Sequence, residues 1–409
     1  MATNAFLTDD IISLEGLSVL ENNLVAAKHT DRKKEALFGT HGGSNRSDTI
    51  RVRKPNQYTV RSGRTYSAQN IEDQYTTMLV DTQIGVDTEI YSDEFKQDLS
   101  SFSDQIIKPQ AALLANEIDK AVLTAAKQTH NIVGTQGTVP SALSTYLAAG
   151  VKLDQNAAPR DGQRAMIIGP QMQADAIDFL KGLFNSQSKL GEQFGSGEVA
   201  KRVAGFDWDM SQNLASHTVG PLGGTPATNG IPANGATTIV TNGWTAAAAA
   251  RVKANDVFTL PGIYSVNPVS KVSTGVLMQI RVTADGSSDG SGNLTLSVDP
   301  PLYSSGARQN ISAAIASAQA LTFFGAASTA GSQGAAWHKS AIALAFCPLP
   351  KPEGVDMAST KTDRQLGISL RFVRWFDGDT DSFKARFDVK YGVKVLRPEW
   401  VVRVASGAA

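Results

Sequence analysis

The side chains that could perform catalysis or hold a cofactor are few and scattered in this 409-residue sequence. Its five histidines are isolated, and none lies four residues from another, which is the spacing of a helical zinc site. They are His29, His41, His130, His217 and His338. The sequence has no P-loop, no H-E-x-x-H and no G-x-G-x-x-G after a strand. We therefore expect neither an enzyme nor a bound cofactor.

Two acidic loops and one cysteine have the residue types of a metal or redox site. Asp285–Asn293 begins like a calcium loop, but its twelfth position, where an EF-hand has a bidentate Glu, is Leu296. Asp377–Asp381 places three carboxylates at alternate positions, which suits either a metal or a polar turn between strands. Cys347 ends an apolar run and is expected to be buried. We favour turns at both loops and expect no metal.

The distribution of charge is more informative than the catalytic inventory. The sequence has 38 basic and 38 acidic residues, and this neutrality argues against tight, sequence-independent binding of nucleic acid. Residues 46–64 nevertheless have a net charge of +5, and residues 69–105, the acidic segment, have −8. Two interpretations remain open: neutralisation within one chain, or contact between the basic residues of one copy and the acidic segment of the next.

The elements that position these charges begin with an amphipathic helix, predicted over residues 8–30. Residues 46–64 are predicted to form two short strands, 50–53 and 58–61, because apolar and polar residues alternate in both. A two-stranded ribbon is barely stable alone. A helix of about 20 residues follows from Pro109, where the missing N–H costs nothing.

The second half of the chain changes character at residue 216. Residues 216–336 contain only nine charged residues, with short β-rich runs between turns, which predicts an inserted all-β barrel or sandwich. Before it, residues 165–168 are predicted to form a buried strand and 171–183 a helix. After it, strands are predicted at 341–346, 368–376 and 383–397. Arg371, Arg374 and Trp375 would form either a nucleic-acid patch or an ordinary sheet or subunit contact, and their strand alternation favours the contact. The fold class is α+β.

This order of elements resembles the major coat proteins of tailed bacteriophages, which have the HK97-type shell fold. The inserted β domain makes the chain similar to the P22-type coat proteins of short-tailed phages. Four segments carry the resemblance: Pro109–Asp119, Arg202–Asp207, Ala341–Pro350 and Tyr391–Glu399. Within the last of these, Tyr391-Gly392 and Arg397-Pro398-Glu399 are the most specific.

The resemblance implies a division of the chain into the parts of a shell subunit. These would be an N-terminal arm (1–44), an extended loop (45–75), a peripheral domain with the spine helix (76–140), an axial domain (141–215), an inserted β domain (216–336), a second axial part (337–384) and a C-terminal peripheral part (385–409). The extended loop would reach over a neighbouring copy. The contact residues expected between copies are Arg46, Arg51, Arg53, Lys54, Arg61, Arg64, Glu72, Asp73, Asp81, Asp87 and Glu89.

The resemblance also implies a structural function in the virion. Copies would assemble in the host cytoplasm, as hexamers and pentamers, into an icosahedral head that encloses double-stranded DNA without specific binding. Scaffolding and portal proteins, and a decoration protein, would be further partners, and no membrane is expected. A basic scaffolding protein would dock on the acidic face of the arm, which consists of Asp9, Asp10, Glu15 and Glu21. The alternatives are an encapsulin-like protein nanocompartment shell and a glycan-binding, β-rich surface protein.

Overall fold

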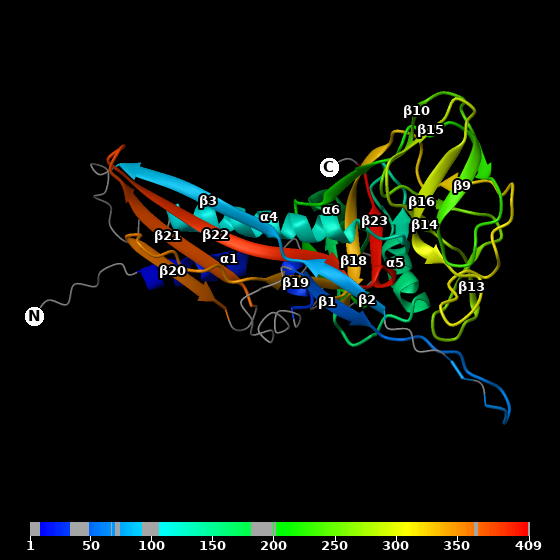
Figure 1. The fold of residues 1–409 in the computed structure, drawn as a ribbon, viewed down its shortest axis with the longest axis horizontal. Coiled ribbons are helices and arrows are strands. Elements are labelled where there is room, and N and C mark those ends of the chain that lie inside the picture. Colours follow the sequence, from blue (N-terminus) through cyan, green and yellow to red (C-terminus); the bar gives the residue numbers. More distant parts are fainter. Residues whose placement is uncertain are drawn as a thin grey trace, which may run out of the picture. The chain divides into compact units, whose positions relative to one another are not determined.

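The computed structural model describes residues 9–32, 49–66, 68–69, 74–91, 106–180, 199, 202–363 and 367–407 (Figure 1). The chain divides into two compact units, which we describe separately. The first unit comprises Met1–Arg53, Tyr75–Ala125 and Ile342–Leu396, and the second comprises Lys54–Gln74, Ala126–Ala341 and Arg397–Ala409. Within the described ranges, no helix is long and apolar enough to cross a membrane.

The sheet of the first unit is organised around one long strand, β22, which pairs with neighbours on both sides (Figure 1). Phe387, Val389 and Tyr391 of this strand are buried, as their period-2 spacing predicts. All pairings in the sheet are antiparallel. Its strands are β3 (Thr82–Tyr91), β22 (Ser382–Val395), β21 (Ser369–Asp377), β20 (Met357–Thr362) and β19 (Ile342–Phe346).

Helix α1 (Asp9–Asn23) packs against β20 and β21, and its Ile12 and Leu20 are buried. Gly16 lies at the closest approach, because a Cβ there would be 3.1 Å from the side chain of Leu370. The glycine therefore lowers the helix propensity but lets the helix lie close to the sheet. The helix predicted over residues 8–30 is shorter than expected, and a 3₁₀ helix, η1 (Ala26–His29), follows it.

Helix α4 (Lys108–Ala126) is the long helix predicted from Pro109 onward, and it buries Leu114 and Val122. It also buries Asp119, whose carboxylate accepts hydrogen bonds from the backbone N–H groups of Val25 (2.7 Å) and Ala27 (2.8 Å). These N–H groups lie at the start of η1, where a helix leaves donors without partners. Burial raises the pKa of the Asp119 carboxyl group.

Strands β1 (Thr49–Lys54) and β2 (Gln74–Leu79) pair with each other. Ile50 and Val52 of β1 are buried with Met78, so Arg51 and Arg53 at the alternate positions are exposed. The second strand predicted at 58–61 is wrong, because those residues form no strand in the structure. β1 finds its partner instead at the start of the acidic segment.

Two arginines of the first sheet share one buried carboxylate. Asp388 is fully buried, and its two oxygens lie 2.6 Å from Nη2 of Arg371 and 2.8 Å from Nη2 of Arg386. Gly85 of β3 is opposite Asp388 in the ladder, and a Cβ there would lie 2.5 Å from Oδ1 of Asp388. Because Arg374 also pairs with a carboxylate, that of Asp356, the structure favours the sheet-contact interpretation over the nucleic-acid patch.

The second unit contains a sheet and two helices, α5 (Leu143–Gln155) and α6 (Pro170–Leu180). Both helices share a hydrophobic core with strand β5 of the sheet. Strand β5 confirms the buried strand predicted at 165–168. The sheet has the order β4 (Ile132–Gly134), β23 (Val401–Ala405), β18 (Ala330–His338), β5 (Arg164–Ile168) and β6 (Asp207–Met210), and β7 (Ala215–Thr218) also pairs with β18. Two 3₁₀ helices, η4 (Lys339–Ala341) and η5 (Pro398–Trp400), complete this part.

The charge-poor segment, residues 216–336, forms a closed barrel. Its strands have the order β17 (Thr322–Phe323), β11 (Val257–Thr259), β14 (Ile280–Val282), β16 (Leu294–Leu302), β9 (Ala236–Trp244) and β8 (Gly224–Thr228). The barrel closes because Ala227 of β8 bridges to Ala320, just before β17. Phe258 and Ile280 lie in its core. Two small ladders, β10 (Ala249–Val252) with β15 (Gly286–Ser288) and β12 (Tyr264–Val266) with β13 (Ser273–Leu277), lie outside this sheet.

The strand pairing corrects the expected domain ranges after residue 336. The division expected between 384 and 385 falls inside β22, which pairs with β19 and β21. Residues 342–377 therefore belong with α4 in the first unit, and not with the axial segment 141–215. β23 pairs with β18 and β4, so the C-terminal residues belong to the second unit. The insertion limits expected at 216 and 336 fall inside β7 and β18.

We predict that Asp388→Asn lowers the free energy of unfolding of the first unit by about 3–5 kcal/mol, because it leaves two cations without a buried partner. Urea denaturation of the unassembled chain measures this loss. Asp356→Asn is the matched control: it removes a carboxylate that is 43% exposed and pairs with Arg374, so it should cost less than about 1 kcal/mol. Equal losses in the two variants would contradict the buried role of Asp388.

A second prediction concerns pH. Burial lowers the pKa of His130 from 6.5 to about 4. Between about pH 6.5 and pH 4, the unfolded chain therefore binds a proton at His130 that the folded chain does not bind. The free energy of unfolding falls as the pH drops through this range, by about 3 kcal/mol in total. In His130→Gln, the free energy of unfolding of the second unit should depend less on pH between pH 7 and about pH 4. Identical pH profiles for the variant and the wild type would rule out this linkage.

Candidate functional site

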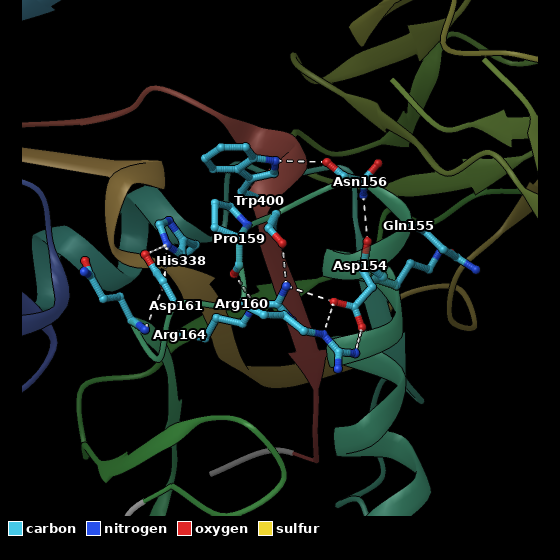
Figure 2. A network of polar contacts seen from close by, with 12 residues as sticks. Asp154, Gln155, Asn156, Pro159, Arg160, Asp161, Arg164, His338 and Trp400 are labelled. Carbon is cyan, nitrogen blue, oxygen red and sulfur yellow. Dashed lines mark hydrogen bonds and ion pairs between the residues drawn. The ribbon is translucent and has the colours of Figure 1, made fainter. Parts of the chain in front are cut away.

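The histidine His338 lies in a polar network that joins the loop after helix α5 to strand β18 (Figure 2). Its Nε2 lies 3.1 Å from Oδ1 of Asp161, and its Nδ1 lies 2.8 Å from Oγ of Ser340. A serine, a histidine and an aspartate linked by hydrogen bonds are also the residues of a catalytic triad. Here, however, Nδ1 of His338 also accepts a hydrogen bond from the backbone N–H of Ser340 in η4. His338 therefore satisfies the donor that begins this short helix.

The same network holds the loop between α5 and β5 through one carboxylate and two arginines (Figure 2). Asp154 accepts hydrogen bonds from Nε of Arg160 (2.8 Å) and from Nη2 of Arg164 (2.9 Å). The pKa of Asp154 is lowered, first by its hydrogen bond with Arg160. Trp400 donates its indole N–H to the carbonyl oxygen of Asn156 at 3.0 Å. These contacts fix the loop on the sheet of the second unit.

Both acidic loops are turns held by their own hydrogen bonds. Asp289 accepts the backbone N–H groups of Ser291 and Asn293, each at 2.8 Å. Asp377 pairs with Lys384, and this hydrogen bond lowers the pKa of the Asp377 carboxyl group. The described residues contain no group of three His, Cys, Asp or Glu side chains that could hold a metal ion.

Cys347 is half-buried, which corrects the expectation of a buried residue. It lies one residue beyond β19, where Pro348 already has an exposed side chain, so the end of the strand leaves the thiol partly in contact with solvent.

The basic residues of the extended loop reach solvent, and only Lys54 has an electrostatic interaction with a described carboxyl group, that of Glu399. Arg51, Arg53, Lys54, Arg61 and Arg64 are all exposed, and none of them forms an ion pair with a described residue. Arg51 lies over the ring of Tyr75, 5.1 Å from its centroid. Arg61 donates from Nη1 to the backbone carbonyl of Thr65 at 2.9 Å. Arg46 lies outside the described residues.

The same loop exposes apolar side chains, which a folded chain normally covers. Val60 is fully exposed, Tyr66 is 83% exposed and Tyr58 is 55% exposed. The residues around them form no helix or strand. The loop therefore combines unpaired positive charge with uncovered apolar surface, which is the combination that marks a binding surface.

The carboxylates of the acidic segment have partners on their own sheet. Asp87 lies 3.5 Å from Nε of Arg386, and Glu89 accepts a hydrogen bond from Oγ of Ser382 at 2.6 Å, with Lys384 at 3.9 Å. Both carboxylates remain exposed, and Asp81 is exposed as well. Glu72 and Asp73 lie outside the described residues.

Within the first unit, Arg51 and Arg53 form no ion pair with the described carboxylates of the acidic segment. Sequence analysis missed Lys384 and Arg386 as the partners of the acidic strand. The two bases alternate along β22 with the same period of two as the two acids along β3, and this pattern could have predicted the pairing. In the antiparallel ladder, Lys384 is opposite Glu89 and Arg386 is opposite Asp87. In the arm, Glu15 and Glu21 are half-buried. The side chains of Asp9 and Asp10 lie outside the described residues.

Solved structures of similar overall extent come from phages and from a virus-like particle. A structure from Mycobacterium phage Che8 is 15% identical, with 94% of this chain and 92% of that chain covered and a TM-score of 0.47. The mature capsid of bacteriophage PhiM1 is 12% identical (88% and 82% covered, TM-score 0.45). A virus-like particle from Pyrococcus furiosus is 8% identical (97% and 98% covered, TM-score 0.39).

No curated protein matches the sequence. The family model described as P22 coat protein, gene protein 5, matches residues 1–404 of the 409. The match extends through both units and includes the barrel. The chain belongs to the P22 coat protein family, and it is a structural major capsid protein of the virion.

Proposed function

We propose that copies of this coat protein build an icosahedral head by placing the extended loop of one copy on the acidic segment of the next. One observation carries the proposal: the five described basic residues of the loop are exposed and have no ion-pair partner among the described residues. The exposed carboxylates of Asp81, Asp87 and Glu89 offer the complementary charge.

Charge alone would give this contact little energy and much specificity. A surface ion pair contributes ~0–1 kcal/mol, but opposite potentials orient two copies and fix their register. Burial of Tyr58, Val60 and Tyr66 against the neighbour would add the larger, non-directional part, at roughly 25 cal/mol per Å² of apolar surface. The loop has no core of its own, so both gains appear only on assembly.

The remaining partners follow from the role of a container. The zero net charge suits enclosure of double-stranded DNA without tight binding, because many phosphate contacts would hold the genome through counterion release. A scaffolding protein would direct assembly, a portal protein would occupy one vertex, and hexamers and pentamers would form the shell. None of these steps requires catalysis by the chain.

We predict that the triple variant Arg51→Glu, Arg53→Glu and Arg61→Glu blocks shell formation, while the chain stays folded. The three side chains lie on the surface, so their reversal repels the acidic segment of a neighbour and leaves the core intact. Electron microscopy and sedimentation measure shell yield, and circular dichroism checks the fold.

The matched control reverses three exposed lysines outside the loop, Lys253, Lys339 and Lys351, to glutamate. This control changes the net charge by the same amount, so it should form shells at close to the wild-type yield. Normal shells from the loop variant, or equal loss in the two variants, would reject the loop as the inter-subunit contact.

A further prediction concerns scaffolding. Substitution of Asp9, Asp10, Glu15 and Glu21 by Asn or Gln should weaken binding of a basic scaffolding protein by about tenfold or more, since opposite charges steer the encounter of two proteins. Co-sedimentation at low salt and at about 0.5 M salt measures the affinity and its screening. Unchanged incorporation of scaffolding protein would remove the arm from this role.

A further inference from the structure

Strand β3 has one edge without a strand partner among the described residues. It pairs with β22 along ten residues, from Thr82 opposite Tyr391 to Tyr91 opposite Ser382. No other described strand pairs with it. An edge of this length presents a row of backbone N–H and C=O groups, which accept an added strand unless something covers them.

The extended loop contains a segment that has the sequence pattern of a strand but no strand partner among the described residues. Residues 57–61 alternate in the manner of a strand, with Tyr58 and Val60 against Thr59 and Arg61, but they form no strand in the chain itself. All five residues are exposed. The sequence of a strand is thus present without a sheet to receive it.

One side of this segment is already paired, by the side-chain amide of Gln69. The backbone N–H of Thr59 donates to Oε1 of Gln69 at 2.8 Å, and Nε2 of Gln69 donates to the carbonyl of Thr59 at 2.6 Å. In an extended chain, the N–H and C=O groups of successive residues point to opposite sides. In a strand over residues 57–61, the backbone groups of Tyr58 and Val60 would therefore face the side that Gln69 leaves open.

We propose that residues 57–61 of one copy add as a strand to the open edge of β3 in a second copy. This inference rests on the proposed function and gives that contact its backbone geometry. Arg61 and the neighbouring Lys54 and Arg64 bring positive charge to an edge strand that exposes Asp87 and Glu89. Five residues at about 3.3 Å each extend ~17 Å, well within the ten-residue length of β3.

Proline substitution separates this arrangement from docking by charge alone, because proline removes a backbone donor without changing charge. Val60→Pro should reduce shell yield about tenfold or more, since it removes a donor that faces β3. Gln57→Pro is the matched control, because its N–H points to the Gln69 side, and it should assemble within about twofold of wild type. Val60→Ala keeps the N–H and loses only part of the buried apolar surface, so it should reduce shell yield less than Val60→Pro does.

Both proline variants should stay folded, because residue 60 and residue 57 lie in an exposed segment without secondary structure. Equal circular dichroism and equal urea midpoints verify this before assembly is measured. Equal yields from Val60→Pro and Gln57→Pro overturn the strand addition. If the arginine reversals still block assembly in that case, the charge contact of the proposed function stands without it.

Hydrogen exchange gives a direct second test. The amides of Tyr58 and Val60 should exchange at least about 100-fold more slowly in shells than in the unassembled chain, together with alternate amides of β3. Fast exchange at Tyr58 and Val60 in complete shells overturns the proposal. Slow exchange along β3 in a complex with scaffolding protein alone, before shells form, would assign the edge to that protein and also overturns it.

Discussion

The organisation of the first unit depends on the length of one strand, β22. Its fourteen residues pair with β3 and β21 over one part and with β19 over the next, so segments from both ends of the chain meet on it. The same strand carries Lys384 and Arg386 beside the acidic carboxylates and buries Asp388 between two arginines. Because β22 provides these bases, the positive charge of the extended loop is left for another molecule.

In the proposed contact, this division of charge would let a chain with no net charge assemble through charge. The acidic strand is partly compensated by its own sheet, which limits its repulsion between copies in a shell. The loop is not compensated, so it repels other loops and is drawn to acidic surfaces. Neutrality of the whole chain and strong local fields are therefore compatible.

The sequence correctly predicted those helices and strands that an uninterrupted local pattern of apolar residues defines. The long helix at Pro109 and the buried strand at 165–168 are periodic and uninterrupted, and the structure contains both. The prediction of a strand at 58–61 was wrong. Alternating apolar and polar residues show that a segment can pair as a strand, but a strand also needs a neighbouring strand with which to pair. The division at 384 was wrong because strand pairing across the chain is not visible in local composition.

The surface of the proposed contact could be identified in the sequence to the same extent. Segregated charge is a property of the sequence, so the basic loop and the acidic segment could be identified before the structure. The role of Gln69 could not be predicted, because a glutamine in a polar loop carries no signal until its amide is seen against the backbone of Thr59. The close approach of α1 to the sheet at Gly16 was hidden for a similar reason, since propensity alone counts that glycine as a defect.

The amide of Gln69 also limits how far pairing can propagate. Chains with exposed β-forming segments stack into fibrils when each strand offers two open edges, because every addition creates a new site for the next. With Thr59 already paired on one side, residues 57–61 can accept a neighbour only on the other. In the proposed strand addition, a loop of this kind would end a sheet instead of extending it, so copies of the chain could assemble into a shell without endless cross-β growth.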